Sequence, residues 1–261
     1  MFGGIMTNAW LAGSLVAVVA GVVGFFVVLR GATFAAHGVP LASFAGAAGA
    51  SVVGVPAVVG LAVFSPVAAV AIGLLGRRRR SDVVTALVVA AMLGLGALFL
   101  SWTVEYASEI YALLFGEVLG VTGTEVWLSA ALTGAALLAV ATLYRPLLLS
   151  SVAGEVAEAR GVRTARLELL FLVLMAVVTT LAVPVVGTLL MFTLMVGPPA
   201  AARAFVRSPL AAMAASVGIA LVTVWLAIAL AYETTWPIGF FVGIAGAAWY
   251  VLARVVAARR R

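Results

Sequence analysis

Long runs that are almost free of charged residues alternate along this chain with short clusters that hold most of its arginines. A helix that crosses a bilayer needs roughly 20 predominantly apolar residues, and most of these runs are close to that length. Because a segment in lipid must satisfy its own backbone hydrogen bonds, each run predicts a membrane-spanning α-helix. The predicted spans are residues 8–28, 52–75, 82–102, 127–143, 167–183, 188–202, 210–231 and 238–256.

Two further segments fit this pattern less well. Residues 34–50 are apolar but rich in Ala and Gly, and Gly38 and Pro40 interrupt them. Small residues let helix backbones approach closely, so this segment predicts a short helix packed inside the bundle. Residues 105–126 carry several carboxylates among apolar residues, and we expect them to stay on the outer side. Either segment can be re-entrant, so the pattern predicts about eight or nine crossings.

The arginines and glutamates predict an orientation, because cytoplasmic segments of membrane proteins carry an excess of basic residues. Nine crossings with an external N-terminus place the basic segments in the cytoplasm. These segments are Arg30, Arg77–Arg80, Arg145, residues 150–166, Arg203, Arg207 and the C-terminus. The same topology places one set of carboxylates outside, namely Glu105, Glu109, Glu117, Glu125 and Glu233.

Composition narrows the class of protein. Hydrophobic residues make up 66% of the 261 residues and only 9% are charged, against about 25% in an ordinary globular domain. So few polar side chains exclude a soluble enzyme, a disordered chain and a secreted disulfide scaffold. The net charge of +6 comes from arginines placed as topology determinants, so it indicates no nucleic-acid partner. We therefore predict a single all-α, polytopic membrane domain over residues 1–261.

The sequence lacks the common catalytic motifs. It has no G-x-x-x-x-G-K-[ST] phosphate loop, no H-E-x-x-H zinc motif, one His and no Cys. We expect no enzyme activity from this chain, so a source of energy must lie in a partner. The first apolar run has no basic n-region and leads into Arg30 without an A-x-A cleavage site, so it predicts a retained span.

The most polar segment, residues 150–166, follows the predicted span 127–143. Its charged residues and a central glycine predict a short amphipathic helix that ends where Gly161 adopts a left-handed conformation. Such a helix suits docking into a groove on a cytoplasmic partner, although an ordinary solvated loop is the alternative. The residues expected to make this contact are Glu155, Glu158, Arg160, Gly161 and Arg163.

Several blocks of sequence together resemble one family. They are Arg30-Gly-Ala-Thr-Phe, Leu114-Phe-Gly-Glu-Val-Leu, Glu158-Ala-Arg-Gly-Val-Arg, and the run from Gly187 through Pro198-Pro199 to Arg203. In order and spacing they resemble the permease subunits of bacterial zinc and manganese ABC importers, the ABC-3 family. The resemblance covers nearly the whole chain.

This resemblance implies a function and a set of partners. Members form a permease dimer in the bacterial cytoplasmic membrane and bind two cytoplasmic ATPase subunits, which hold ATP and Mg. An extracytoplasmic binding protein delivers a divalent metal ion, such as zinc, manganese or iron, and alternating access moves it inward. Residues 150–166 would then contain the coupling helix. The permease itself binds no cofactor apart from the metal that it transports.

The first block departs from the family at its metal-ligand positions. After the Arg-Gly-x-Ser-Phe element, members carry an Asp and, four residues later, a His. Here His37 stands at the Asp position and Leu41 at the His position. An imidazole is a ligand for transition metals, and an ionisable residue at membrane depth is a functional candidate. His37 is therefore a candidate metal ligand, with a neutral His bonded to a backbone carbonyl as the alternative.

Other candidates come from the remaining polar and helix-breaking positions. Outer-mouth carboxylates could attract a cation or contact a binding protein, namely Glu105, Glu109 and Glu117. Helix breaks at Gly187, Pro198 and Pro199 could form a gate, or could be kinks that neighbouring helices absorb. Thioethers at Met191 and Met195, and hydroxyls at Thr179 and Thr180, could line the pathway, although packing explains each pair equally well.

Two other functions stay open from the sequence. Because the family's ligand pair is altered, the substrate could be a metal chelate or another small solute instead of a bare ion. A secondary transporter or channel is also possible, but it would need its own coupling-ion site, usually an intramembrane carboxylate. The middle of each predicted span lacks one.

Overall fold

The computed structural model describes residues 4–76, 81–102, 114–116, 118–234 and 236–259. Within these ranges every regular secondary-structure element is a helix. The helices are α1 (Gly4–Arg30), α2 (Thr33–Val53), α3 (Ala57–Leu75), α4 (Ser81–Leu100), η1 (Val118–Gly120), α6 (Gly123–Val152), α7 (Gly154–Ala159), α8 (Thr164–Val186), α9 (Thr188–Phe205), α10 (Pro209–Thr234) and α11 (Ile238–Arg259). The predicted all-α fold is confirmed.

Eight of these helices are long and apolar enough to cross a membrane, counted over the described part of the chain. They are α1, α2, α3, α4, α6, α8, α10 and α11. Helix α9 is not among them; it has 18 residues, with Pro198 and Pro199 inside it and Arg203 in its last turn. Seven of the eight predicted spans, together with residues 34–50 in α2, therefore have the length and apolar character of a membrane span.

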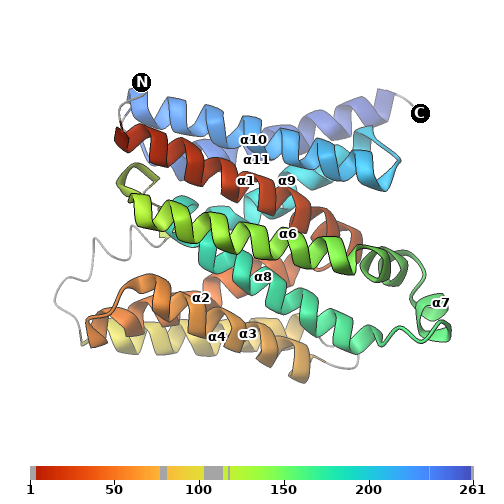
Figure 1. The fold of residues 1–261 in the computed structure, drawn as a ribbon, viewed down its shortest axis with the longest axis horizontal. Helices are drawn as coiled ribbons and strands as arrows, with labels where there is room; N and C mark the ends of the chain where they lie inside the picture. Colours follow the sequence, from red (N-terminus) through yellow and green to blue (C-terminus); the bar gives the residue numbers. More distant parts are fainter. Residues whose placement is uncertain (1–3, 77–80, 103–113, 117, 235, 260–261) are drawn as a thin grey trace.

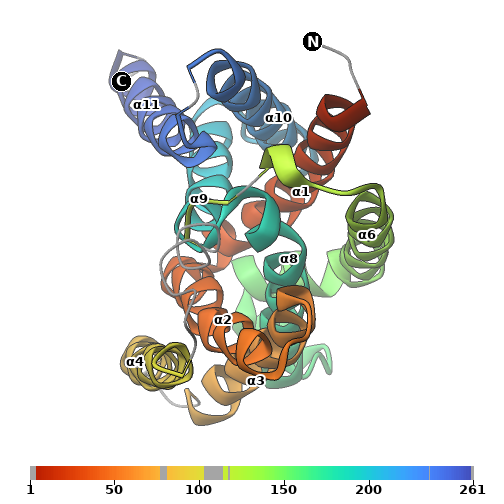
Figure 2. The ribbon, with the colours of Figure 1, turned by 90° about the vertical axis from the view of Figure 1, so that its left-hand side faces the viewer.

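The long helices lie side by side in a bundle whose two flanks are built from different parts of the sequence (Figures 1 and 2). Helices α2, α3 and α4 form one flank, and α9, α10 and α11 form the other. Helices α1 and α8 lie between them, and each has 72% of its most apolar window buried inside the protein. Helix α4 has only 17% buried, so most of its surface is available to lipid.

Residues 34–50 were expected to form a short helix interrupted at Gly38 and Pro40, and this prediction is wrong. Helix α2 runs without a break from Thr33 to Val53, with Pro40 inside it and buried. A proline removes one backbone hydrogen bond, but α2 packs against α3, α4, α8 and α9. This burial outweighs the lost bond, and it confirms that the segment lies inside the bundle.

The flank of α2 and α3 depends on a contact between two glycines. A Cβ atom built at Gly46 would overlap the carbonyl oxygen of Gly60, and one at Gly60 would overlap the carbonyl oxygen of Gly46. The backbones therefore touch directly, as small residues permit in membrane helices.

We expect Gly46→Val to destabilise the protein by about 1–3 kcal/mol, the usual cost of overpacking a filled interior. The added side chain must push α2 away from α3. The measurement is the Tm of the purified protein in detergent, taken as the temperature at which the monodisperse peak on size exclusion is half lost. Gly94→Val on α4 is the matched control, because a Cβ at Gly94 meets open space. Equal Tm values for the two variants would contradict this packing.

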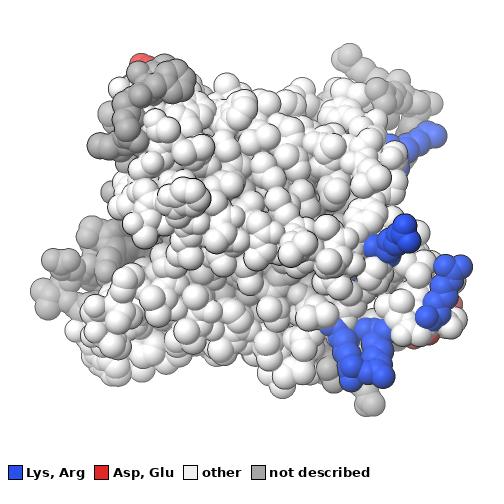
Figure 3. Space-filling view, in the orientation of Figure 1, with Lys and Arg blue, Asp and Glu red and all other residues white. Residues whose placement is uncertain are grey.

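The arginines visible in Figure 3 gather at one end of the bundle, near α7. We call this the arginine-rich end. One cavity at this end is lined by Arg30, Asp82 and Glu168. The turn between α1 and α2 and the starts of α4 and α8 therefore also lie at the arginine-rich end. The segregation of basic residues that the sequence predicted is therefore present among the described arginines.

Candidate functional site

His37 lies in the second turn of α2, where its ring meets the ring of Phe192 on α9. The ring centroids are 4.9 Å apart and the planes are inclined at 71°. Both side chains line a pocket of about 200 Å³ together with Thr33 and Phe34. The Nδ1 atom of His37 is buried and has no hydrogen-bond partner among the described residues. The alternative in which Nδ1 of His37 bonds to a backbone carbonyl is therefore not observed. The role of His37 as a metal ligand stays a prediction.

The metal-binding capacity of this pocket is limited. Over the described ranges, no three His, Cys, Asp or Glu residues come together as they would around a tightly held ion. A single imidazole beside two aromatic rings can offer one nitrogen ligand, which is suitable for transient contact with a transition metal. A transporter needs a site that releases its substrate, so weak coordination is compatible with transport.

Of the three predicted helix breaks, the structure contains one at Gly187 and none at Pro198 and Pro199. Gly187 has φ +81° and separates α8 from α9. A Cβ atom there would overlap the carbonyl oxygen of Leu114, so this break also requires glycine for space. In contrast, α9 continues through Pro198 and Pro199, which are both buried inside it. The pair therefore does not break the helix, and of the two alternatives it agrees with a proline distortion that the neighbouring helices absorb.

The other pathway candidates are buried within the bundle. Met191 and Met195 have no exposed surface and belong to the main hydrophobic core. Thr180 donates a hydrogen bond from Oγ1 to the carbonyl of Ala176 in its own helix at 3.1 Å. The Oγ1 atom of Thr179 is buried without a partner in the described structure. Packing therefore accounts for the methionines and for Thr180.

The outer carboxylates Glu105, Glu109 and Glu117 lie outside the described residues. Their neighbour Glu125 is in the first turn of α6, where it forms a capping box with Thr122. The Glu125 carboxylate accepts a hydrogen bond from the Thr122 backbone N–H at 2.8 Å, and its own N–H donates to Thr122 Oγ1 at 3.3 Å. This pairing satisfies donors at the start of the helix.

The predicted short helix near the arginine-rich end is confirmed as α7. Gly161 has φ +82°, its N–H donates to the Glu158 carbonyl, and the Val162 N–H donates to the Ala157 carbonyl, each at 2.9 Å. These two bonds form a Schellman motif, the usual end of a helix at a left-handed glycine. Ala157 is buried, whereas the charged candidates are exposed, namely Glu155, Glu158, Arg160 and Arg163. The helix thus presents its charges outward.

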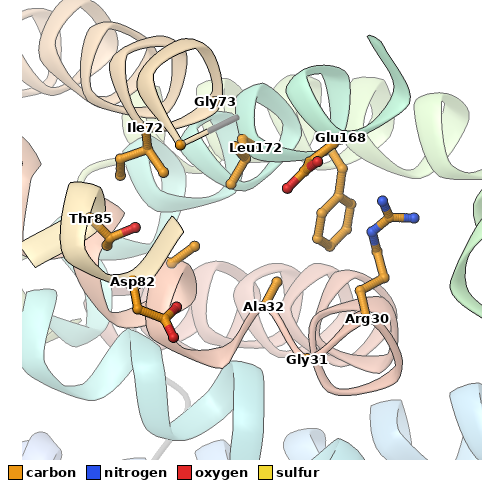
Figure 4. A pocket seen from close by; sticks show the side chains of 12 residues that line it. Arg30, Gly31, Ala32, Ile72, Gly73, Asp82, Thr85, Glu168 and Leu172 are labelled. Carbon is orange, nitrogen blue, oxygen red and sulfur yellow. The ribbon is translucent and has the colours of Figure 1, made fainter. Parts of the chain in front are cut away.

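Sequence reasoning placed Arg30 among the cytoplasmic basic residues and in the first family block, and it assigned no role to Asp82 or Glu168. All three residues line a cavity of about 220 Å³ between α1, α2, α3, α4 and α8 (Figure 4). The Arg30 guanidinium donates to Ser150 Oγ at 2.8 Å and lies 5.3 Å from the centroid of the Phe171 ring. No pattern in the sequence shows this contact, because Arg30 and Ser150 are 120 positions apart.

A model of the ABC 3 transport family matches residues 3–257. The manganese import system permease protein ScaB of Streptococcus parasanguinis is 25% identical over 258 residues, which cover 98% of this chain and 92% of that protein. The manganese transport system membrane protein MntC of Listeria innocua is 29% identical over 201 residues, which cover 76% and 71%.

Solved structures show the same fold. PsaBC from Streptococcus pneumoniae in complex with Fab matches with a TM-score of 0.86 at 24% identity, over 96% of this chain and 91% of that chain. A structure described as an inward-facing, metal-chelate type ABC transporter matches with a TM-score of 0.73 at 17% identity, over 95% and 85%. Because the family model covers nearly the whole chain and eight helices can cross a membrane, this protein belongs to the ABC-3 family of transporter permeases in the bacterial cytoplasmic membrane.

Proposed function

We propose that this chain is the permease subunit of an ABC importer that moves a divalent metal ion into the cell, with manganese as the first candidate. The observation that carries this proposal is the similarity, over 98% of the chain, to a protein named as a manganese import permease. The sequence has no phosphate loop of its own, so ATP and Mg are held by a separate ATPase subunit.

The described parts have distinct roles in this proposal. Helix α7 and Gly161 form the coupling helix that docks on the ATPase at the arginine-rich end, which is the cytoplasmic side. His37 offers a nitrogen ligand to the ion as it passes, and the break at Gly187 allows α8 and α9 to move separately. A second copy of the chain completes the pathway, and an extracytoplasmic binding protein delivers the ion near Glu105, Glu109 and Glu117.

A metal chelate is the second candidate substrate. The pocket beside His37 is lined by Phe34 and Phe192, and no carboxylate belongs to its described lining. A chelate brings most of its own ligands and offers apolar surface to aromatic rings, so it needs only one nitrogen from the protein. Manganese without a chelator prefers oxygen ligands in addition to imidazole.

The test is to purify the chain together with a candidate ATPase subunit and to reconstitute the complex in proteoliposomes. We expect uptake of radioactive manganese only when ATP is supplied on the side of the vesicle membrane that corresponds to the cytoplasm. The same vesicles are then supplied with manganese bound to a small chelator, which distinguishes the two substrates. Uptake that proceeds without ATP, by a chain that does not associate with the ATPase, would show a secondary transporter or channel and defeat the proposal.

A further inference from the structure

The last residue of α1, Arg30, is half-buried and contacts two other helices. Its NH1 donates to Ser150 Oγ at 2.8 Å and to Ser151 Oγ at 3.4 Å, both in the last turn of α6. Its guanidinium also lies over the ring of Phe171 on α8. Hydrogen bonds and ring contacts of a cation strengthen when water is partly excluded, so this one side chain joins α1, α6 and α8.

The two serines are oriented to receive the guanidinium. Ser150 and Ser151 each donate their own hydroxyl proton to the carbonyl of Leu147, one turn earlier in α6. With the proton used in this way, the lone pairs of each hydroxyl oxygen are available as acceptors. Arg30 can only donate, so the pairing is chemically matched. Both bonds come from NH1, so the feature that a lysine would lack is the planar guanidinium lying over the Phe171 ring.

The contacts of Arg30 lie on both sides of α7. Ser151 precedes the first residue of α7, Gly154, by one turn, and Phe171 lies two turns into α8, which follows α7 in the chain. On the other side, only Gly31 and Ala32 separate Arg30 from α2, whose first two turns carry Thr33, Phe34 and His37. Arg30 therefore connects the α6–α7–α8 arm with the helix that bears the pocket.

A second arginine ties the remaining pocket helix to the same place. Arg203, in the last turn of α9, donates from NH1 to the carbonyl oxygen of Val28 at 3.2 Å. Val28 is in the last turn of α1, two residues before Arg30, and α9 carries Phe192. Both helices that line the pocket, α2 and α9, are thus attached to the arginine-rich end of α1.

We propose that Arg30 is a positioning residue for transport, which makes the α1–α2 turn move together with the α6–α7–α8 arm and so transmits ATP-driven motion of α7 to the pocket at His37. This inference rests on the proposed function as an ABC importer permease. Arg30 touches no substrate in this scheme. Without it, the arm could move while α2 stays in place, and ATP would be hydrolysed with little transport.

The experiment uses the complete complex of the chain and its ATPase in proteoliposomes, with manganese as the substrate. Uptake and ATP hydrolysis are measured on the same vesicles for Arg30→Ala, Arg30→Lys and the double variant Ser150→Ala/Ser151→Ala. We expect manganese transported per ATP to fall about tenfold in Arg30→Ala, within the usual range of coupling between sites. The double serine variant should also fall, and Arg30→Lys should retain an intermediate ratio.

Control variants and a second substitution keep the inference falsifiable. Arg254→Ala removes an exposed arginine from α11 and should leave the ratio unchanged. If Arg30→Ala or the serine variant lowers uptake and hydrolysis in equal proportion, or changes neither, the inference is wrong. If Arg30→Ala does not fold, the serine variant decides, because it keeps the arginine and removes the hydroxyl oxygens that accept from it. A wild-type chain that fails to bind the ATPase contradicts the proposed function itself, and this is seen before any variant is compared.

Discussion

Replacing Gly161 with Val is expected to abolish ATP-driven transport while the protein still inserts into the membrane. Gly161 has φ +82°, a conformation that costs an ordinary L-residue roughly 1–2 kcal/mol and a β-branched residue more. The valine would lose the Schellman hydrogen bonds to Ala157 and Glu158. Helix α7 would then end in a different direction, and its exposed charges would no longer fit the ATPase.

The measurement compares ATP-dependent uptake and co-purification of the ATPase with the amount of chain in the membrane. Gly161→Asn is the matched control, because asparagine adopts the left-handed conformation more readily and should keep most of the activity. A Cβ at Gly161 meets open space, so crowding does not explain a loss in the valine variant alone. Normal transport by Gly161→Val would remove the basis for treating α7 as the coupling helix.

The second large effect is expected for His37→Ala, which should lower ATP-dependent manganese uptake about tenfold, the effect of losing a contact worth about 1.4 kcal/mol. The imidazole is the one nitrogen ligand that lines the described pocket, and its Nδ1 has no protein partner to lose within the described structure. Removing it should therefore affect the substrate more than the fold. Uptake rates against manganese concentration would be measured beside Tm and ATPase binding.

Two further variants separate a ligand role from packing against Phe192. His37→Asp introduces the residue type that the family resemblance implies for this position and should recover manganese uptake, since a carboxylate is a suitable ligand for this ion. His37→Phe fills the pocket without offering a ligand and should behave as His37→Ala does. Full uptake by His37→Phe would show that the side chain only packs. Thr142→Ala on the exposed face of α6 serves as the neutral control.

The predictions from the sequence differ from the structure more at prolines than at the apolar runs. The lengths of the runs identified most of the spans, since length and polarity are all that a bilayer demands of a helix. Pro40 was expected to interrupt a helix, and Pro198 and Pro199 were expected either to break a helix or to kink it, but α2 and α9 continue through all three. The cost of a proline is local and can be estimated from sequence, whereas the burial that offsets it comes from neighbouring helices.

The glycines also divide into those whose role could be predicted from the sequence and those whose role depends on packing. Gly161 could be recognised as a helix end because the polar residues around it already predicted a short helix that must stop. Gly46 and Gly60 gave no such signal, since their close contact joins two helices that the sequence does not align. The pocket is similar: His37 was a candidate as the chain's lone histidine, but its partner Phe192 lies on α9 and became apparent only from the packing.

The sequence by itself determined that this is an all-helical membrane protein, that its arginines gather at one end, and that a short helix with a glycine end lies there. These properties depend on hydrophobicity, charge and local backbone preference, which act along the chain. Only the tertiary structure decided that Arg30 meets Ser150 and that His37 meets Phe192. Those contacts join residues more than a hundred positions apart, and the packing that selects them is a property of surfaces that exist only once the helices have assembled.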